Sequence, residues 1–305
     1  MKTRKLILLI ADGLLLIALI LQILLASGDK VKIYELKDQP DEISITSPDE
    51  SFTLVKENGH WFVGEKKYPA NDDYVENLLD SLKSVKVMDK VAIANNEVTI
   101  NRYELNEGKN ILVQAKKEGK VLRTLNIGKE STAGSQSYIT VDEGKDIYLA
   151  GGSLTSTFSK NLSYFRSRNV YSLDKEQITS VTINSENGKS WTLSKTGSGD
   201  DVSWYTNVAD LVIDASKAAD WVKGIASINT PVWHDDSDLS GGNKLLTAEI
   251  SCGSTSTSLE IYEIPAKTEE DKVLYYGFSS ASPYQFELAT YAVQRFQKNA
   301  EDLAE

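Results

Sequence analysis

Residues 71–85 read NDDYVENLLDSLKSV, and residues 214–228, which start 143 positions later, read DASKAADWVKGIASI. In both stretches, apolar residues recur at the three- and four-residue spacing of one helix face. Each stretch begins with Asn71 or Asp214, a residue whose side chain accepts hydrogen bonds from the free amides of a first helical turn. The matched apolar positions are Val75, Leu78, Leu79, Leu82 and Val85 in the first stretch, and Ala218, Trp221, Val222, Ile225 and Ile228 in the second. The pattern predicts one amphipathic helix in each half of the chain.

The sequence before each predicted helix also repeats. The matched segments are Ile43-Ser44-Ile45 with Val181-Thr182-Ile183, FTLVK of residues 52–56 with WTLSK of residues 191–195, and Trp61 with Trp204. Their alternation of apolar and polar residues predicts half-buried strands. Asn58-Gly59 and Asn187-Gly188 favour the positive φ angles of tight hairpin turns. We therefore expect a hairpin of strands in front of each helix.

After the first helix the chain returns to strands, which apolar alternation predicts at 111–115, 121–127, 136–141 and 147–149. Helical patterns follow at 155–164 and, near the end of the chain, at 290–296. Two further matches keep the same order, residues 104–108 with 238–242 and residues 158–161 with 296–299. This ordered series indicates a duplication. The predicted fold class is α+β, with two related units of mainly antiparallel sheet and packed helices.

Several short motifs in the first half occur in a fixed order. They are an I-x-I strand (Ile43, Ile45), an L-x-K-x-x-G-x-W hairpin (Leu54, Lys56, Gly59, Trp61), Gly128-Lys129 after a strand, Tyr138, Ile147-Tyr148-Leu149, and the arginine-rich exit FRSRNV of residues 165–170. In this order they resemble the bacterial family catalogued as domain of unknown function 4340 (DUF4340). The resemblance covers most of residues 1–183 and, more loosely, the second copy. It supplies no catalytic residue. Members are often encoded beside ATP-binding-cassette transporters that resemble those linked to gliding motility, which implies an accessory role at a membrane complex.

A 21-residue apolar segment, residues 6–26, contains ten Leu, five Ile and a single charge, Asp12. As a helix with a rise of ~1.5 Å per residue it would span ~31 Å, close to the ~30 Å hydrocarbon core of a bilayer. Because a cleavable signal peptide has an apolar region of only ~7–15 residues, we expect an uncleaved, single-pass transmembrane helix. Lys2, Arg4 and Lys5 precede it. The positive-inside rule then places the amino terminus in the cytoplasm and residues 27–305 on the extracytoplasmic side of the cell membrane.

Asp12 has two interpretations. An intramembrane carboxylate beside Ala11, Ala18 and Gln22 is suited to contact a partner helix. Alternatively, it is a tolerated charge near the cytoplasmic end that reaches toward water, and we favour this second interpretation.

These features divide the chain into five predicted parts. They are a cytoplasmic stub (1–5), a transmembrane helix (6–26), a linker (27–40), a first α+β repeat unit (41–172) and a second α+β repeat unit (173–305).

The composition offers little for catalysis. The net charge of −11 argues against nucleic-acid binding, which needs basic patches. His60 and His234 are the only histidines and Cys252 is the only cysteine, which restricts most acid–base and metal schemes. We expect His60 on a surface strand and Cys252 as a small, half-buried strand residue. The sequence contains no phosphate-binding loop, serine-hydrolase elbow, dinucleotide fingerprint or zinc-protease helix. We therefore assign no catalytic, cofactor-binding or metal-binding residue.

Residues 234–242 form the most site-like stretch. Asp236, Asp238, Ser240 and Gly241 fit positions one, three, five and six of a calcium loop, but Thr247 occupies position twelve, where a bidentate glutamate is required. We interpret this stretch as a solvated acidic turn.

The remaining candidates are arginines and tyrosines. Arg166 and Arg168 are expected to hold the two units together by pairing with carboxylates, and an anionic ligand is the alternative. The tyrosines expected as packed strand residues, and not as a sugar-binding platform, are Tyr138, Tyr148, Tyr275, Tyr276 and Tyr284.

Together these observations predict a membrane-anchored, extracytoplasmic, non-enzymatic binding or accessory protein without a cofactor. By the resemblance, its partners are subunits of an ATP-binding-cassette transporter. The alternative is an extracytoplasmic hydrolase that uses a pair of carboxylates assembled from distant segments.

Overall fold

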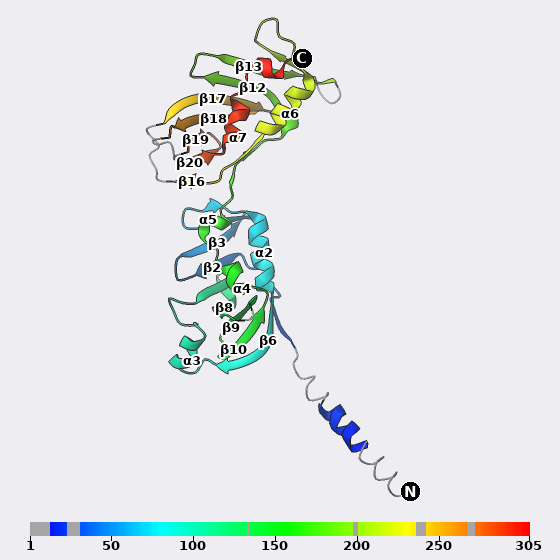
Figure 1. Ribbon diagram of the computed structural model, residues 1–305, viewed down its shortest axis with the longest axis vertical. Coiled ribbons are helices and arrows are strands. Elements are labelled where there is room, and N and C mark those ends of the chain that lie inside the picture. The colour runs from blue at the N-terminus through cyan, green and yellow to red at the C-terminus, as the bar shows by residue number, and fades with distance from the viewer. Residues whose placement is uncertain (1–12, 23–30, 133, 198–200, 236–241, 267–271) are drawn as a thin grey trace. The chain divides into compact units, whose positions relative to one another are not determined.

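The computed structural model describes residues 13–22, 31–132, 134–197, 201–235, 242–266 and 272–305. It divides into two compact units, unit 1 (Met1–Ser167) and unit 2 (Arg168–Glu305), which Figure 1 shows. Unit 2 begins a few residues before the expected boundary at 172/173, because strand β11 (Asn169–Ser172) pairs with β15 (Ser227–Asn229) of the same unit. Both units are mostly antiparallel sheet with several helices, which is an α+β arrangement.

In the described part of unit 1, ten strands form one sheet. The elements are β1 (Lys32–Glu35), β2 (Glu42–Thr46), β3 (Ser51–Glu57), β4 (His60–Val63), β5 (Tyr68–Pro69), α2 (Asp72–Lys83), β6 (Ser84–Ile93), α3 (Glu97–Arg102), β7 (Ile111–Lys117), β8 (Lys120–Glu130), β9 (Gln136–Val141), β10 (Asp146–Gly151), α4 (Leu154–Phe158) and α5 (Leu162–Phe165). The strand order is β1-β6-β10-β9-β8-β7-β2-β3-β4-β5. Every neighbouring pair in it is antiparallel.

Helices α2, α4 and α5 lie over one face of this sheet (Figure 1). That face is apolar because every second strand residue points toward it, and Ile43, Val113 and Leu125 are fully buried there. On the opposite face the same strands carry half-buried polar residues such as Ser44 and Gln114. One covered face and one polar face are typical of an antiparallel sheet.

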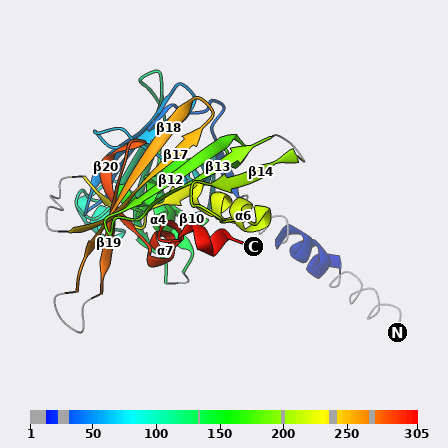
Figure 2. The same cartoon turned by 90° about the horizontal axis from the view of Figure 1, so that it is seen from above.

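Unit 2 has a main sheet and a small one in its described part. The elements are β11, the 3-10 helix η1 (Lys175–Gln177), β12 (Ile178–Ser185), β13 (Ser190–Thr196), β14 (Ser203–Thr206), α6 (Ala215–Ile225), β15, β16 (Trp233–His234), β17 (Asn243–Cys252), β18 (Thr255–Ile264), β19 (Leu274–Ser279), β20 (Ser282–Leu288), α7 (Thr290–Phe296) and η3 (Ala300–Leu303). The main sheet has the order β14-β13-β12-β17-β18-β19-β20-β16, and β11 and β15 pair separately. Figure 2 shows α6 and α7 on the same side of the main sheet.

The two main sheets share one strand order. The series β4-β3-β2-β7-β8-β9-β10-β6 in unit 1 corresponds to β14-β13-β12-β17-β18-β19-β20-β16 in unit 2. The register agrees as well, because Ile43 lies opposite Leu54, and their sequence counterparts Val181 and Leu193 also lie opposite each other. The two units therefore repeat one architecture, residue by residue, through the centre of each sheet.

Strand β6 marks the largest difference between the two sheets. In unit 1 it is one ten-residue strand that pairs first with β1 and then with β10. In unit 2 the matching residues form two short strands, β15 against β11 and β16 against β20. Pro231 lies between them and has no amide hydrogen to continue a ladder. As a result β1 belongs to the main sheet of unit 1, whereas β11 stays in a separate pair.

Helices α2 and α6 confirm the two predicted amphipathic helices, except that the last matched pair, Val85 and Ile228, lies in strands β6 and β15. All of the matched apolar positions are buried. The caps are confirmed too. Asn71 Oδ1 accepts a hydrogen bond from the Tyr74 amide (3.1 Å), and Asp214 Oδ1 accepts one from the Lys217 amide (2.9 Å).

The hairpin turns agree with the sequence only in part. Asn58-Gly59 forms the β3–β4 turn, with φ angles of 51° and 89°. Asn187-Gly188 was expected to do the same in the second copy, but it forms the β12–β13 turn, one hairpin earlier. Of these two residues only Gly188 has a positive φ, 82°. The dipeptide marks a turn in both places without marking the same turn.

Three predictions about the ends of elements need correction. The linker predicted at 27–40 is wrong for residues 32–35, which form β1 against β6. The helical pattern at 155–164 is divided into α4 and α5. Helix α3 was not predicted, and it has no buried residue from which an apolar period could be read.

Residues 13–22 are helical, and their seven Leu and Ile side chains are 47–69% exposed. The rest of the predicted 6–26 span, Asp12 included, and the stub 1–5 lie outside the described residues. Within the part of the chain that is described, none of the helices has both the length and the apolar character needed to cross a bilayer.

Candidate functional site

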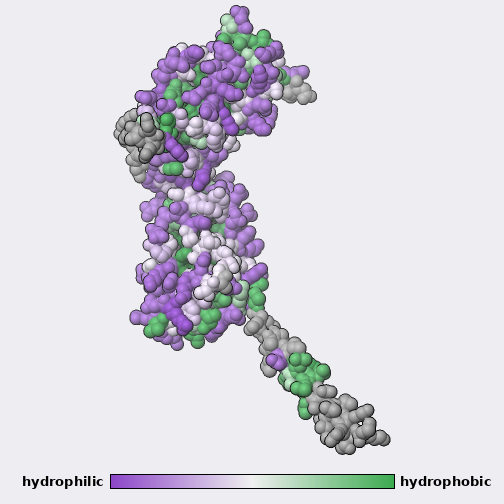
Figure 3. Space-filling model, in the orientation of Figure 1, coloured by the Kyte–Doolittle hydropathy of each residue, from purple (hydrophilic) through white to green (hydrophobic). Residues whose placement is uncertain are grey.

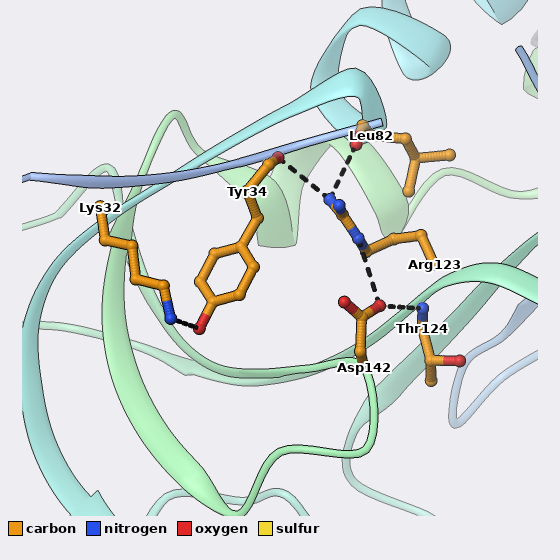
Figure 4. A network of polar contacts seen from close by, with 6 residues as sticks. All are labelled: Lys32, Tyr34, Leu82, Arg123, Thr124 and Asp142. Carbon is orange, nitrogen blue, oxygen red and sulfur yellow. Dashed lines mark hydrogen bonds and ion pairs between the residues drawn. The ribbon is translucent and has the colours of Figure 1, made fainter. Parts of the chain in front are cut away.

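Arg123 on β8 is 3% exposed and lies where β1, α2 and the sheet of unit 1 meet (Figure 4). Its Nη1 donates hydrogen bonds to the carbonyl oxygens of Tyr34 and Leu82, each at 3.2 Å. Leu82 belongs to the last turn of α2, where carbonyls have no donor within the helix. Arg123 therefore donates hydrogen bonds both to a carbonyl of strand β1 and to a carbonyl at the end of helix α2.

Asp142 faces the same guanidinium from the β9–β10 turn. Its Oδ1 lies 3.2 Å from Arg123 Nε, an ion pair that lacks the alignment of a hydrogen bond. The same oxygen accepts the Thr124 amide at 3.0 Å (Figure 4). Burial lowers the pKa of Arg123, and Asp142 opposes that shift. Because the guanidinium remains charged at neutral pH and is occupied by protein partners, this network is structural.

Unit 2 brings charged and aromatic side chains together on the sheet face opposite its core. We call the following six residues the cross-strand row: Lys244 of β17, Glu260 and Tyr262 of β18, Tyr276 of β19, Glu287 of β20 and His234 of β16. In neighbouring strands Lys244 lies opposite Tyr262, Tyr262 opposite Tyr276, and Tyr276 opposite Glu287. The adjacent residues Ile261 and Phe286 are fully buried, so the row occupies the other face.

One end of the row is a lysine, a glutamate and a tyrosine. Lys244 Nζ lies 2.9 Å from Glu260 Oε1, and the Tyr262 hydroxyl donates to Glu260 Oε2 at 2.9 Å. The hydrogen bond from Lys244 lowers the pKa of Glu260, and the same bond raises the pKa of Lys244. Burial raises the pKa of Tyr262, which keeps its hydroxyl protonated as a donor.

The other end of the row is a histidine and a glutamate. His234 Nε2 lies 2.9 Å from Glu287 Oε1, and the imidazole meets the Tyr276 ring edge-on with centroids 5.2 Å apart. Both side chains are about three-quarters buried. Burial and the nearby Glu287 raise the pKa of Tyr276. Tyr276 itself is only 6% exposed. The row therefore offers the partly exposed Tyr262 ring and the polar groups at its two ends for hydrogen bonds and ring contacts.

Sequence reasoning did not find this row. His234 and Glu287 are far apart in the chain and meet only because β16 pairs with β20. The signal that was available is the alternation in β18, where Glu260 and Tyr262 fall on the face opposite Leu259 and Ile261. The partners across the sheet depend on register, which alternation within one strand does not supply.

The other singled-out residues are dispersed. His60 is exposed at the start of β4, and Cys252 is half-buried at the end of β17. Of the acidic turn, residues 236–241 lie outside the described residues. In the described ranges, His, Cys, Asp and Glu side chains nowhere gather in threes in a way that would hold a metal ion.

The arginine and tyrosine candidates make separate contacts. The Arg166 guanidinium stacks on the Tyr68 ring, 3.7 Å from its centroid. Tyr138 packs on Tyr103 with ring centroids 4.7 Å apart, and Tyr148 donates to Asp146 at 3.3 Å. That Arg166 and Arg168 join the units stays a prediction.

Comparison with known proteins identifies a family. The sequence pattern described as domain of unknown function (DUF4340) matches residues 61–241, more than half of the chain. The chain belongs to the DUF4340 family. The match runs from β4 of unit 1 to the segment before β17 of unit 2, so the DUF4340 pattern includes parts of both copies. No curated protein and no solved structure matches this DUF4340 chain.

Proposed function

We propose that this DUF4340 protein is a membrane-anchored, extracytoplasmic protein that binds a partner and is not an enzyme. The observation that carries the anchor is the helix of residues 13–22 with its seven exposed Leu and Ile side chains. Fully burying one such side chain is worth about 1.5–3 kcal/mol, so together they favour a lipid environment by on the order of 10 kcal/mol. The cations Lys2, Arg4 and Lys5 support a cytoplasmic amino terminus.

The binding surface in this proposal is the cross-strand row. Its lysine, carboxylates and rings combine on one sheet face. Aromatic side chains are enriched in protein contacts, and polar groups form the rim around them. The partner in this proposal is a subunit of an ATP-binding-cassette transporter. This choice rests on the resemblance to a family whose members are often encoded beside such transporters.

The anchor is tested in a bacterial host that expresses the full chain. After an alkaline carbonate wash the wild type stays with the membranes, and the double variant Leu15→Asp/Leu19→Asp is released, because each charge costs roughly 3 kcal/mol in the bilayer. The exposed-site variant Asn187→Cys, in a Cys252→Ser background, reacts with a membrane-impermeant maleimide in spheroplasts. Release of the wild type, or labelling only after lysis, contradicts the anchor or its orientation.

The partner is tested by affinity purification of the full chain from detergent-solubilised membranes. The wild type recovers transporter subunits, and the double variant Lys244→Ala/Tyr262→Ala loses most of that recovery. The control is Thr182→Ala, which changes the same sheet face at β12 outside the row. Recovery of no transporter subunit by the wild type rejects this partner, and equal recovery by both variants rejects the row as the contact.

A further inference from the structure

One edge of unit 1 exposes apolar side chains. We call Val31, Ile33, Met88, Val91, Ile93 and Val98 the apolar edge; they are 38–79% exposed, with Val98 of α3 the most exposed. They belong to β1 and the residue before it, the second half of β6 and the first turn of α3. Figure 3 shows hydrophobic surface at the end of unit 1 where these elements lie, in an otherwise mostly hydrophilic surface.

The pairing of β6 explains why this edge is open. β1 pairs only with residues 84–87 of β6, and β10 pairs with residues 87–93 on the other side. Among the described residues, the second half of β6 therefore has a strand on one side only. An apolar edge strand in water invites association with other chains, so proteins usually protect it with charges, proline or a covering element.

Unit 2 shows that the fold does not require an apolar edge. Position 231, which lies 143 residues after Met88, is a proline, and position 234, which pairs with β20 as Ala92 pairs with β10, is a histidine that pairs with Glu287. The match of position 234 is fixed by register, because Trp233 lies opposite Phe286 as Lys90 lies opposite Tyr148. Val232 is the apolar residue that remains exposed in this part of unit 2. The same edge thus carries a proline and a paired imidazole in one copy, whereas in the other it carries the exposed apolar Met88, Val91 and Ile93 beside the charged Asp89 and Lys90.

The apolar edge also lies close to the anchor along the chain. Residues 23–30 separate the apolar helix from Val31, and eight residues reach at most about 27 Å when fully extended. The predicted span ends at residue 26, which shortens that reach to about 13 Å. Lys86, opposite Ile33 on the same strand pair, adds a cation with an apolar stem that is suited to the headgroup region.

We propose that the apolar edge of unit 1 rests in the interfacial region of the lipid bilayer. This inference rests on the proposed membrane anchor. The bilayer covers the free side of β6, and Val98 on α3 inserts among the headgroups and upper acyl chains, as apolar residues of interfacial segments do. Unit 2, with its proline-interrupted edge, has no such contact.

The test uses the full chain in lipid nanodiscs, with Cys252→Ser and one nitroxide-labelled cysteine at a time. The labelled sites are Val98→Cys and Val91→Cys, with Tyr205→Cys on the exposed strand β14 of unit 2 as the water control and Ile17→Cys as the anchor control. Collision rates with oxygen and with a water-soluble nickel chelate are compared. At positions 98 and 91 the oxygen-to-nickel ratio is at least about threefold higher than at 205, since oxygen concentrates in apolar surroundings that exclude the chelate.

The possible results test the membrane anchor and the contact of the apolar edge with the bilayer separately. A water-like label at position 17 overturns the anchor and the edge contact with it. A membrane-like label at 17 with a water-like label at 98 overturns the edge contact alone. Labels at 91 and 98 that neither reagent reaches indicate a protein partner or a second copy at the edge, which also overturns it. Because Val98 is a surface residue, its substitution preserves the fold, and hydrogen exchange of α2 verifies this.

Discussion

Unit 1 and unit 2 use different side chains to donate a hydrogen bond to the carbonyl at the end of their matched helices. Leu82 of α2 and Ile225 of α6 are matched positions, and the carbonyl of each needs a donor where its helix ends. In unit 1 the donor is Arg123 at 3.2 Å, and in unit 2 it is the Tyr171 hydroxyl at 3.0 Å. Burial raises the pKa of Tyr171, which keeps that hydroxyl protonated. The fold fixes the need for a donor at this carbonyl, and the two copies differ in which residue supplies it.

The two units also differ at the margins of their sheets. Tyr34 of β1 matches Tyr171 of β11, since they lie opposite the matched residues Val85 and Ile228. In unit 1 the buried guanidinium on β8 holds β1 to the sheet, whereas unit 2 has Thr257 at that position of β18. Without the long arginine, β11 is attached through β15 and its own tyrosine. A duplicated core therefore tolerates a different arrangement at its margin.

The largest effect is expected for Trp221→Ala. Trp221 is buried against Trp191, with ring centroids 5.1 Å apart, and its Nε1 donates to the Arg295 carbonyl at 2.7 Å. We expect a loss of about 4–5 kcal/mol in unit 2, since a cavity and an unpaired carbonyl are both created. The matched change Leu78→Ala creates only a cavity, and we expect about 3 kcal/mol in unit 1.

Hydrogen-exchange mass spectrometry at increasing urea measures each unit separately. If each unit has its own hydrophobic core, each variant lowers the protection of backbone amides in its own unit. Equal loss of protection in both units after either change would show one shared core in place of two.

Arg123→Met should have the next largest effect. It leaves the carbonyls of Tyr34 and Leu82 without their donor, and we expect a loss of about 2–4 kcal/mol in unit 1. Asp142 adds little to the loss because it is 46% exposed and stays solvated. In unit 2, Tyr171→Phe removes the matched donor from a single carbonyl, and we expect about 1 kcal/mol. Faster amide exchange in β1 and in the end of α2 is the measurement, and unchanged exchange there would mean that Arg123 does not hold these elements.

Gly277→Ala tests a difference between matched core positions. A Cβ at Gly277 would clash with the ring of the fully buried Phe286, whereas unit 1 has Ile139 at the matching place. We expect unit 2 to lose about 1–3 kcal/mol through overpacking. The double variant Gly277→Ala/Phe286→Leu should recover much of this loss in urea unfolding. No recovery would argue against the ring contact as the cause.

The smallest effect concerns pH and the cross-strand row. Because the pKa of Glu260 is lowered by Lys244, the pair stabilises unit 2 above the ordinary carboxyl pKa, and the contribution disappears as pH falls through the folded pKa. Because the pKa of Lys244 is raised, the contribution also fades in strong base. Lys244→Met should cost below about 1 kcal/mol at pH 7, since the pair is partly exposed.

Unit 1 provides the control for that pH dependence. Asn126 matches Glu260 and makes neutral hydrogen bonds to Asn110 and to the Leu105 carbonyl. The effect of Asn126→Ala on urea unfolding should therefore be the same at pH 7 and pH 3, whereas that of Lys244→Met should vanish at pH 3. A pH-independent effect of Lys244→Met would mean that its stem packing, and not its charge, is what matters.

The sequence was informative where periodicity and a short-range signal agree. The matched apolar faces of α2 and α6, with Asn71 and Asp214 as caps, follow from helical spacing and first-turn amides. The sequence did not predict the parts of the structure that depend on pairing between residues far apart in the chain. β1 is only four residues long and is held by Arg123 from a distant strand, so local pattern assigned it to a linker. The cross-strand row depends on the register of five strands, which no single strand encodes.

Both units repeat one strand register, and paired cysteines test this most directly. In a Cys252→Ser chain, Ser44 and Gln114 face each other in unit 1, and the matched residues Thr182 and Glu249 face each other in unit 2. Facing strand positions satisfy the Cα separation of about 4.4–6.8 Å that a disulfide requires, whereas a shift of two residues places them about 7–8 Å apart. We predict that mild oxidation closes both facing pairs, and that it leaves Ser44→Cys/Leu112→Cys and Thr182→Cys/Thr247→Cys open. Closure of a shifted pair in preference to the facing pair in either unit would contradict the shared register, and with it the duplication.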